Sequence, residues 1–187
     1  MNLPNALTLS RFFWTVIFII CLNQNSLRST VFAALVFAIA SITDLLDGYI
    51  AKTRGLITDF GKIMDPVADK FLMLAAFVMF VKIGVLQAWM VALIFIREIA
   101  VTISRIGRLR RGQVIAAERS GKIKTVFQIV SISVVLFFLI LEKSSWSQNW
   151  SQAAESGWVW GINGLMLVTL ILTINSGLEY FLNLRKL

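Results

Sequence analysis

The most informative residues are aspartates that crowd one short stretch of the chain. Five of the ten acidic residues lie within residues 44–69, and four of them recur at helical spacing, namely Asp44, Asp47, Asp65 and Asp69. Four anions held close together repel one another unless cations neutralise them. The sequence has no histidine and one cysteine, so the available ligands are oxygens, which suit hard cations such as Mg²⁺ or Mn²⁺. This pattern predicts a metal site that acts on phosphate groups.

Small and basic residues accompany the aspartates. Positions three or four apart share a helix face, which places Gly48 and Ala51 beside the first two aspartates. These small residues leave room for a bulky group against the backbone, and Lys52 offers a positive charge to a phosphate. We expect Gly61 in the turn just before the next helix. We expect Asp59 in the loop, where its charge is solvated.

Long apolar stretches must position these residues. The chain has 187 residues, of which 58% are hydrophobic and 15% charged, and its mean hydropathy is +0.80. A membrane span needs about 20 apolar residues, so six spans leave no room for a separate soluble domain. Residues 1–187 are therefore predicted to form a single all-α integral membrane domain, with Pro4 and Pro66 near helix starts. The expected spans are Leu7–Leu22, Thr30–Thr53, Asp65–Val81, Leu86–Arg105, Gly121–Leu141 and Trp158–Leu182.

The placement of lysine and arginine predicts the orientation. With the N-terminus in the cytoplasm, Arg28, Lys82 and Lys143 lie outside, and the other 15 of the 18 Lys and Arg residues lie on or near the cytoplasmic side. An even number of spans then puts both termini in the cytoplasm. Five of the six tryptophans fall toward the outer ends, as interfacial anchors do. The net charge of +8 therefore fits an anionic membrane surface, whereas nucleic-acid binding would need aromatic residues among the arginines.

The aspartate stretch carries a family resemblance. Written out, it reads Asp44-x2-Asp47-Gly48-x2-Ala51-Lys52-x8-Gly61-x3-Asp65-x3-Asp69. This pattern resembles the signature of the CDP-alcohol phosphotransferase family, with every spacing matched. The family usually has arginine where this chain has Lys52, which keeps the charge and lacks the two-pronged guanidinium. Over nearly its whole length the chain looks like the bacterial family members that use glycerol 3-phosphate, through residues 2–11, 65–70, 96–99 and 121–125.

The resemblance implies a fold, a cofactor and a reaction. It implies a six-transmembrane-helix bundle, often a homodimer, in the bacterial inner (cytoplasmic) membrane with its site facing the cytoplasm. It also implies two Mg²⁺ or Mn²⁺ ions, which would bridge the diphosphate of CDP-diacylglycerol. Asp69 is the implied general base for a hydroxyl of glycerol 3-phosphate, and the products are phosphatidylglycerophosphate and CMP. The implied metal ligands are Asp44, Asp47, Asp65 and Asp69, and the implied CDP-binding residues are Gly48, Ala51, Lys52 and Gly61.

The second substrate is a dianion and needs cations of its own. Arg97 lies at membrane depth beside Glu98, and Arg105 follows eight residues later on the same face. Lys122 and Lys124 enter the next predicted span. We expect these four cations to bind the acceptor phosphate; the alternative for Arg97 is a buried pair with Glu98 or with an aspartate. The basic residues of the intervening loop, Arg108, Arg110, Arg111 and Arg119, are expected to serve as the positive-inside signal and to attract anionic lipid.

The sequence is compatible with two other functions. The same signature serves enzymes with another acceptor, such as phosphatidylglycerol, serine or inositol phosphate, and the signature alone does not separate them. A divalent-cation transporter also places carboxylates inside membrane segments. Against transport, the acidic residues gather near one membrane face and not along a path through the helices. Phosphatidyl transfer to glycerol 3-phosphate is therefore the leading hypothesis.

Overall fold

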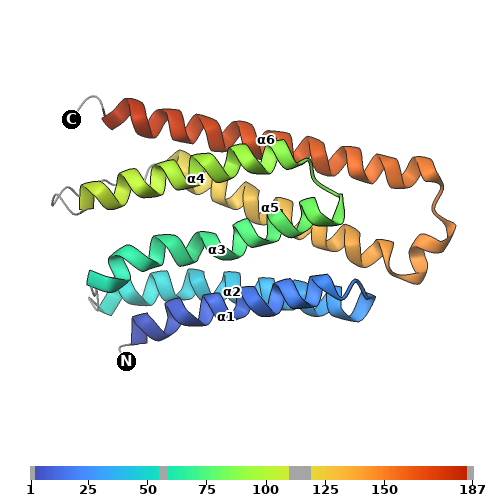
Figure 1. Ribbon diagram of the computed structural model, residues 1–187, viewed down its shortest axis with the longest axis horizontal. Coiled ribbons are helices and arrows are strands. Elements are labelled where there is room, and N and C mark those ends of the chain that lie inside the picture. The colour runs from blue at the N-terminus through green and yellow to red at the C-terminus, as the bar shows by residue number, and fades with distance from the viewer. Residues whose placement is uncertain (1–2, 55–58, 110–118, 185–187) are drawn as a thin grey trace. The chain divides into compact units, whose positions relative to one another are not determined.

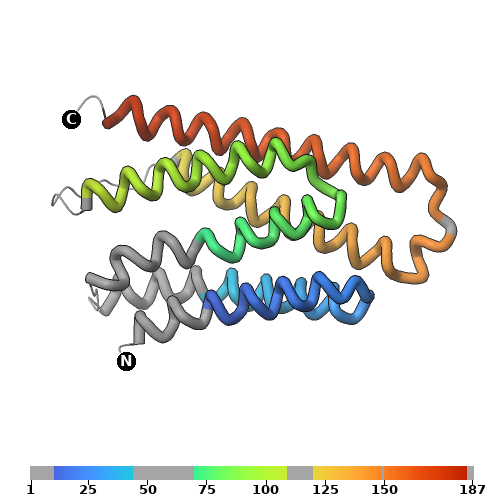
Figure 2. The backbone as a smooth tube through the Cα atoms, viewed as in Figure 1, coloured from blue at the N-terminus to red at the C-terminus, as the bar shows by residue number. Residues whose placement is uncertain are grey.

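The structure is a computed structural model that describes the backbone of residues 3–54, 59–109 and 119–184. Side chains are described for residues 11–43, 70–108, 120–148 and 150–184, which are coloured in Figure 2. The side chains of the aspartate stretch, residues 44–69, lie outside this set.

Six α-helices and one short 3-10 helix make up the described backbone, which contains no strand (Figure 1). The prediction of an all-α chain is confirmed. The helices are α1 (Leu3–Asn23), α2 (Leu27–Arg54), α3 (Asp59–Ile83), α4 (Ala88–Leu109), α5 (Arg119–Glu142), the 3-10 helix η1 (Ser145–Asn149) and α6 (Gln152–Leu184).

Helix α3 begins earlier than the sequence indicated. Asp59, expected in a loop, is its first residue, and Gly61, expected in the preceding turn, is also helical, so both expectations were wrong. An acidic residue is favoured at a helix N-terminus because it opposes the positive end of the helix dipole. As a result Pro66 lies well inside α3 and not near its start. A proline there cannot donate a backbone hydrogen bond to the preceding turn.

Local capping fixes where two of the helices begin and end. The N–H of Ser29 donates to Oγ of Ser26 at 3.2 Å, and the N–H of Ser26 donates to Oγ of Ser29 at 3.2 Å. This reciprocal pair satisfies amide donors that the first turn of α2 leaves open. Helix α3 ends at Ile83, and the residue after it, Gly84, has a left-handed φ of 89°. The N–H of Gly84 donates to the carbonyl of Val81 at 3.0 Å.

The chain divides into two compact units. Unit 1 comprises residues 1–79 and 136–148, and unit 2 comprises residues 80–135 and 149–187. In unit 1, α1 and α2 lie side by side (Figure 1). The buried rings of Phe18 and Phe37 meet with their centroids 6.1 Å apart, and Phe12 meets Phe71 of α3 at 4.9 Å. Aromatic contacts of this kind contribute beyond simple burial and hold α1 to both neighbours.

Unit 2 is built from α4, the first part of α5, and α6. Helices α4 and α6 lie side by side (Figure 1). The side-chain amide of Asn163 on α6 donates to the carbonyl of Val85 at 3.1 Å and so holds the turn that precedes α4. Ser131 of α5 and Thr169 of α6, both buried, share a hydrogen bond of 2.8 Å. The buried apolar residues of unit 2 include Ile94, Val101, Ile132, Val135, Ile162, Met166 and Leu170.

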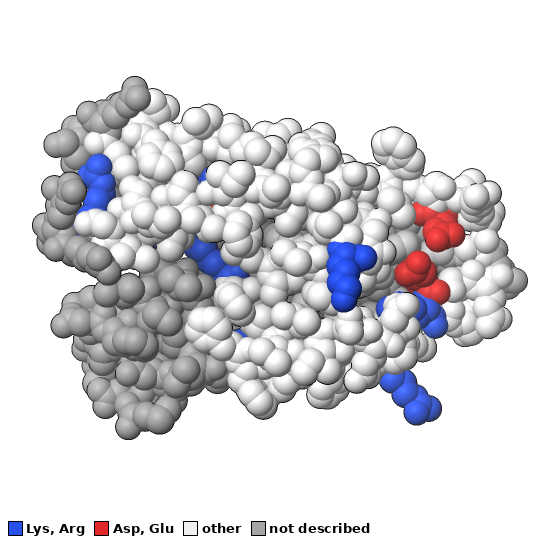
Figure 3. All heavy atoms as spheres, in the orientation of Figure 1, with Lys and Arg blue, Asp and Glu red and all other residues white. Residues whose placement is uncertain are grey.

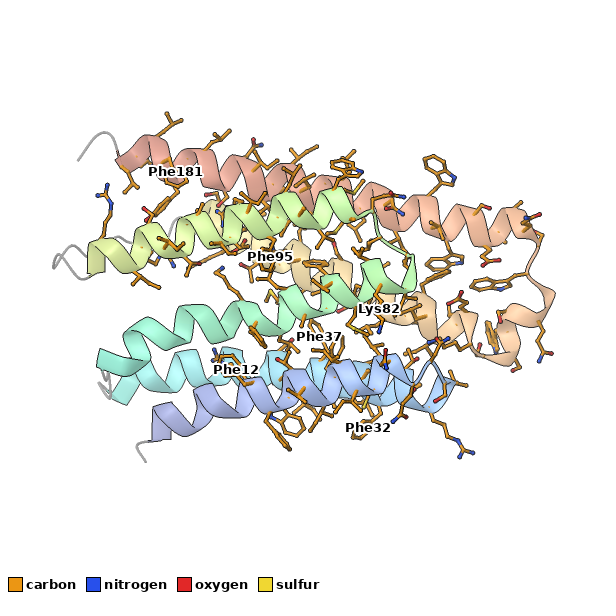
Figure 4. All side chains as sticks on the ribbon, in the orientation of Figure 1. Phe12, Phe32, Phe37, Lys82, Phe95 and Phe181 are labelled. Carbon is orange, nitrogen blue, oxygen red and sulfur yellow. The ribbon has the colours of Figure 1, made fainter. Side chains whose placement is uncertain are left out.

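The surface of the described residues has the character of a membrane protein. Large apolar side chains are exposed on all six α-helices, among them Phe32, Phe95 and Phe181, which are labelled in Figure 4. Most of the described surface that is visible in Figure 3 carries no charge. Within the searched residues, Ser120–Glu142 and Gln152–Leu184 are long and apolar enough to cross a bilayer by length and composition. Helices suit that environment because their backbone groups are satisfied internally.

We predict that one partly buried hydrogen bond stabilises unit 1. The Lys143 ammonium donates to Oγ1 of Thr30, which is fully buried, at 3.0 Å. Thr30→Val keeps the side-chain shape and removes the acceptor, so the unfolding free energy in detergent should fall by about 1–3 kcal/mol. Thr43→Val, at an exposed hydroxyl that donates to the carbonyl of Ile39 in its own helix, is the matched control. An equal loss in the two variants would contradict the prediction.

The same lysine predicts a pH dependence. Burial lowers the pKa of Lys143, an effect that the negative charge of Glu142 opposes. Between the lowered folded pKa and the ordinary lysine value, the unfolded chain binds more protons than the folded chain, so stability rises with pH in that window. Unfolding of wild type and Lys143→Met should therefore be compared across alkaline pH. The rise of the unfolding free energy with pH in this window should be absent from Lys143→Met. Identical slopes of unfolding free energy against pH in the two proteins would argue against this effect of Lys143.

Candidate active site

The aspartate motif is divided between two consecutive helices. Asp44 and Asp47 belong to the C-terminal part of α2, and Asp65 and Asp69 belong to α3. Only residues 55–58 separate the two helices in sequence. Both segments of the motif are helical, so residues three or four positions apart in each segment share a helix face, as the sequence pattern predicted. The side chains of these residues lie outside the description, as do those of Gly48, Ala51, Lys52 and Gly61.

The donor set of the motif fits a hard divalent cation. Four carboxylates without histidine or thiolate are ligands that Mg²⁺ and Mn²⁺ accept. Among the side chains that the structure describes, no three potential metal ligands come together. The aspartate motif, whose side chains lie outside this set, is the predicted metal site.

A second polar cluster, in unit 2, is described in full. Its centre is Glu98 of α4, which is 2% exposed. The Oε1 atom of Glu98 accepts from Nη1 of Arg97 at 3.2 Å, from the ammonium of Lys124, and from the amide of Gln128 at 3.3 Å. Lys124 and Gln128 lie one turn apart on α5 and are both buried. A buried carboxylate is tolerated when it is paired and hydrogen-bonded, and here three side chains meet that requirement.

Arg97 also reaches the third helix of the unit. Its Nη2 atom donates to Oγ of Ser176 on α6 at 2.9 Å, and its side chain is 11% exposed. A guanidinium carries five N–H donors, and Glu98 and Ser176 accept from two of them. The buried Nε atom has no hydrogen-bond partner in the described part of the chain. Arg97 is thus fixed on two sides, and among the described residues only two of its five donors have acceptors.

The structure brings together only part of the predicted acceptor-phosphate set. Arg97 and Lys124 meet at Glu98, and the Arg97–Glu98 pair that the sequence suggested as an alternative is present. Lys122 is exposed, and among the described residues no hydrogen bond or ion pair joins it to this cluster. Arg105 is half-buried, and its Nε atom has no hydrogen-bond partner among the described residues.

Sequence reasoning missed two members of the cluster. Gln128 follows Lys124 by four positions, so a search for polar residues on one face of the predicted helix would have found it. Ser176 gave no such signal, because it is 79 residues from Arg97 and lies in an otherwise apolar stretch. Its role depends on how α6 packs against α4.

The chain is similar to known proteins over most of its length. The model of the CDP-alcohol phosphatidyltransferase family matches residues 1–174. A CDP-diacylglycerol–glycerol-3-phosphate 3-phosphatidyltransferase of Bacillus subtilis is 40% identical over 147 residues, which cover 72% of this chain and 76% of the relative. The relative of that name from Escherichia coli is 32% identical over 186 residues, covering 96% and 92%. A probable phosphatidylglycerophosphate synthase of Mycobacterium tuberculosis is 40% identical over 136 residues, covering 71% of this chain and 65% of the relative.

We predict that Glu98 and Lys124 depend on each other energetically. Glu98→Gln leaves the Lys124 ammonium buried without its carboxylate, so it should lower the unfolding free energy by about 3–5 kcal/mol. Adding Lys124→Met removes the stranded charge, and the double variant should recover part of that loss. Glu155→Gln, at an exposed carboxylate on α6, is the matched control and should change stability little. Additive losses from the two single variants, measured by unfolding in detergent, would contradict the coupling.

Proposed function

Because the chain belongs to the CDP-alcohol phosphatidyltransferase family, we propose that it transfers a phosphatidyl group from CDP-diacylglycerol to glycerol 3-phosphate. The products are phosphatidylglycerophosphate and CMP. The observation that carries the proposal is the complete aspartate motif, distributed over consecutive helices α2 and α3 within the region that the family model matches. The names of the relatives support the choice of acceptor.

The proposed metal ligands are the four aspartates of the motif. Members of this family generally use divalent metal ions. Two Mg²⁺ or Mn²⁺ ions held by Asp44, Asp47, Asp65 and Asp69 would supply positive charge against the diphosphate and the leaving CMP. The oxygen-only donor set supports this assignment.

The chain's own chemistry is a proton transfer. Asp69 accepts the proton of a glycerol 3-phosphate hydroxyl, and the hydroxyl oxygen forms a bond to the phosphatidyl phosphorus. The bond from that phosphorus to the oxygen of CMP breaks, and CMP leaves with the bonding electron pair. Correct placement of the hydroxyl offsets the low basicity of a carboxylate. The proposed residues that bind CDP are Gly48, Ala51, Lys52 and Gly61.

The acceptor phosphate is assigned to the basic residues of α4 and α5. Arg97 has unused donors, and Arg105 is a half-buried cation on the same helix, so both are proposed as direct ligands. Lys122, which is exposed, is proposed to attract the dianion at the entrance. Lys124 belongs to the same set, and its bond to Glu98 supports a role in keeping Arg97 in place.

The membrane arrangement is part of the proposal. Six spans, with both termini and the site on the cytoplasmic side of the bacterial inner membrane, are supported by the six long helices and by the one-sided distribution of Lys and Arg. The residues 1–187 act as one catalytic domain in this proposal. A homodimer is proposed on the family resemblance.

The first test is the choice of acceptor. Purified protein in detergent or liposomes is given CDP-diacylglycerol, Mg²⁺ or Mn²⁺, and in turn labelled glycerol 3-phosphate, serine, inositol phosphate or phosphatidylglycerol. We expect labelled phosphatidylglycerophosphate and CMP with glycerol 3-phosphate only. Product with another acceptor alone would reassign the substrate. Metal-ion flux in liposomes without CMP release would favour the transporter instead.

The second test concerns the base. Asp69→Asn keeps the size of the side chain and removes the proton acceptor, so turnover should fall by about 10²–10⁴-fold. Asp59→Asn, an aspartate of the same helix outside the motif, is the matched control and should stay within about twofold of wild type. Initial rates of CMP release at saturating substrates measure the effect. Turnover like that of wild type in Asp69→Asn would remove this residue from the catalytic role.

A further inference from the structure

Helix α6 contacts the Arg97 side chain in a way that the proposed reaction does not by itself explain. A Cβ atom built on Gly177 would lie 3.1 Å from both Cγ and Nε of Arg97 and 3.6 Å from its Cδ. The two distances of 3.1 Å are shorter than an ordinary van der Waals contact, so a methyl group added at this position requires the arginine side chain to shift by a few tenths of an ångström. Gly177 and its neighbour Ser176 are both buried on α6.

Three contacts together define the position of the guanidinium. Ser176 accepts from Nη2 at 2.9 Å, Glu98 accepts from Nη1 at 3.2 Å, and Gly177 bounds the stem. One turn further along α6, the hydroxyl of Tyr180 donates to Oγ of Ser104 at 3.4 Å, which ties α6 to α4 beside this point. Arginine has a long, flexible side chain, and each contact removes rotamers that would otherwise be populated.

We propose that Ser176 and Gly177 form a seat that positions Arg97 for the acceptor phosphate. The proposal rests on the proposed function, and it makes these two residues of α6 positioning residues that act through Arg97. A guanidinium held in one orientation before the substrate arrives binds a phosphate with less loss of side-chain freedom. It also places the acceptor hydroxyl reproducibly, and a displacement of about 1 Å is enough to slow a reaction strongly.

The seat predicts a selective kinetic effect. Gly177→Ala should raise the KM for glycerol 3-phosphate by about tenfold or more while the KM for CDP-diacylglycerol stays within about twofold. Gly164→Ala, on the same helix with nothing within 4 Å of the added methyl group, is the matched control. Ser176→Ala should shift the same KM in the same direction, and Ser176→Thr, which keeps a hydroxyl, should restore it in part.

A binding measurement separates this inference from the proposed function. Glycerol 3-phosphate or inorganic phosphate, without CDP-diacylglycerol, should raise the unfolding midpoint of wild type and Gly164→Ala, and Gly177→Ala should need higher concentrations for the same shift. One outcome is that wild type forms no product with glycerol 3-phosphate while Gly177→Ala still needs more phosphate ligand than wild type for the same shift of the midpoint. In that case the proposed acceptor is wrong and the positioning role of Ser176 and Gly177 is supported. If product forms and folded Gly177→Ala and Ser176→Ala match Gly164→Ala in both measurements, the seat is wrong. An equal rise in the KM for both substrates in Gly177→Ala, together with wild-type KM values in Ser176→Ala, would also reject the seat.

Discussion

The carboxylate of Glu98 has to be neutralised where it is buried, and much of unit 2 follows from that requirement. An ionised group inside an apolar bundle is stable only when charges and hydrogen bonds replace the water it has lost. Glu98 obtains them from its neighbour Arg97 and from Lys124 and Gln128 of α5. These contacts form only when α5 has one particular rotation about its axis relative to α4. Turning either helix by one residue would move Glu98 away from Lys124 and Gln128. The polar cluster therefore specifies the packing of helices whose apolar faces would tolerate several arrangements.

Arg97 extends the same constraint to α6. Its guanidinium binds both the carboxylate and the hydroxyl of Ser176, and its stem passes against Gly177. A small residue at that point allows close approach, as is common where membrane helices meet. One side chain thus takes part in the packing of unit 2 and in the proposed binding of an anion. This dual role accounts for a largely buried guanidinium that is held by two acceptors while its Nε atom has no hydrogen-bond partner among the described residues.

The helices themselves were largely predictable, for a simple physical reason. A long apolar segment in a bilayer must satisfy its backbone internally, so the stretches that became α1, α2, α4 and α5 could be placed within a few residues. Helix α6 begins at Gln152, earlier than the predicted start at Trp158. The start of α3 was missed because Asp59 was expected in a loop and Gly61 in the turn before the helix. Hydropathy marks where a helix is apolar and does not mark where its backbone begins. Caps and dipole effects decide that boundary, and they act through single residues.

The sequence by itself indicated the family through its motif and the all-helical architecture through its long apolar stretches. It also indicated the candidate metal ligands, because spacing within one helix fixes which residues share a face. The aspartate motif needs nothing beyond that spacing to predict oxygen ligands for a divalent cation. Only the tertiary structure decided that Lys124 bonds to Glu98 and that Ser176 and Gly177 flank Arg97 from 79 and 80 positions away. Contacts between helices depend on their rotation and separation, which arise from the packing of many side chains at once. No local pattern in the sequence records that outcome.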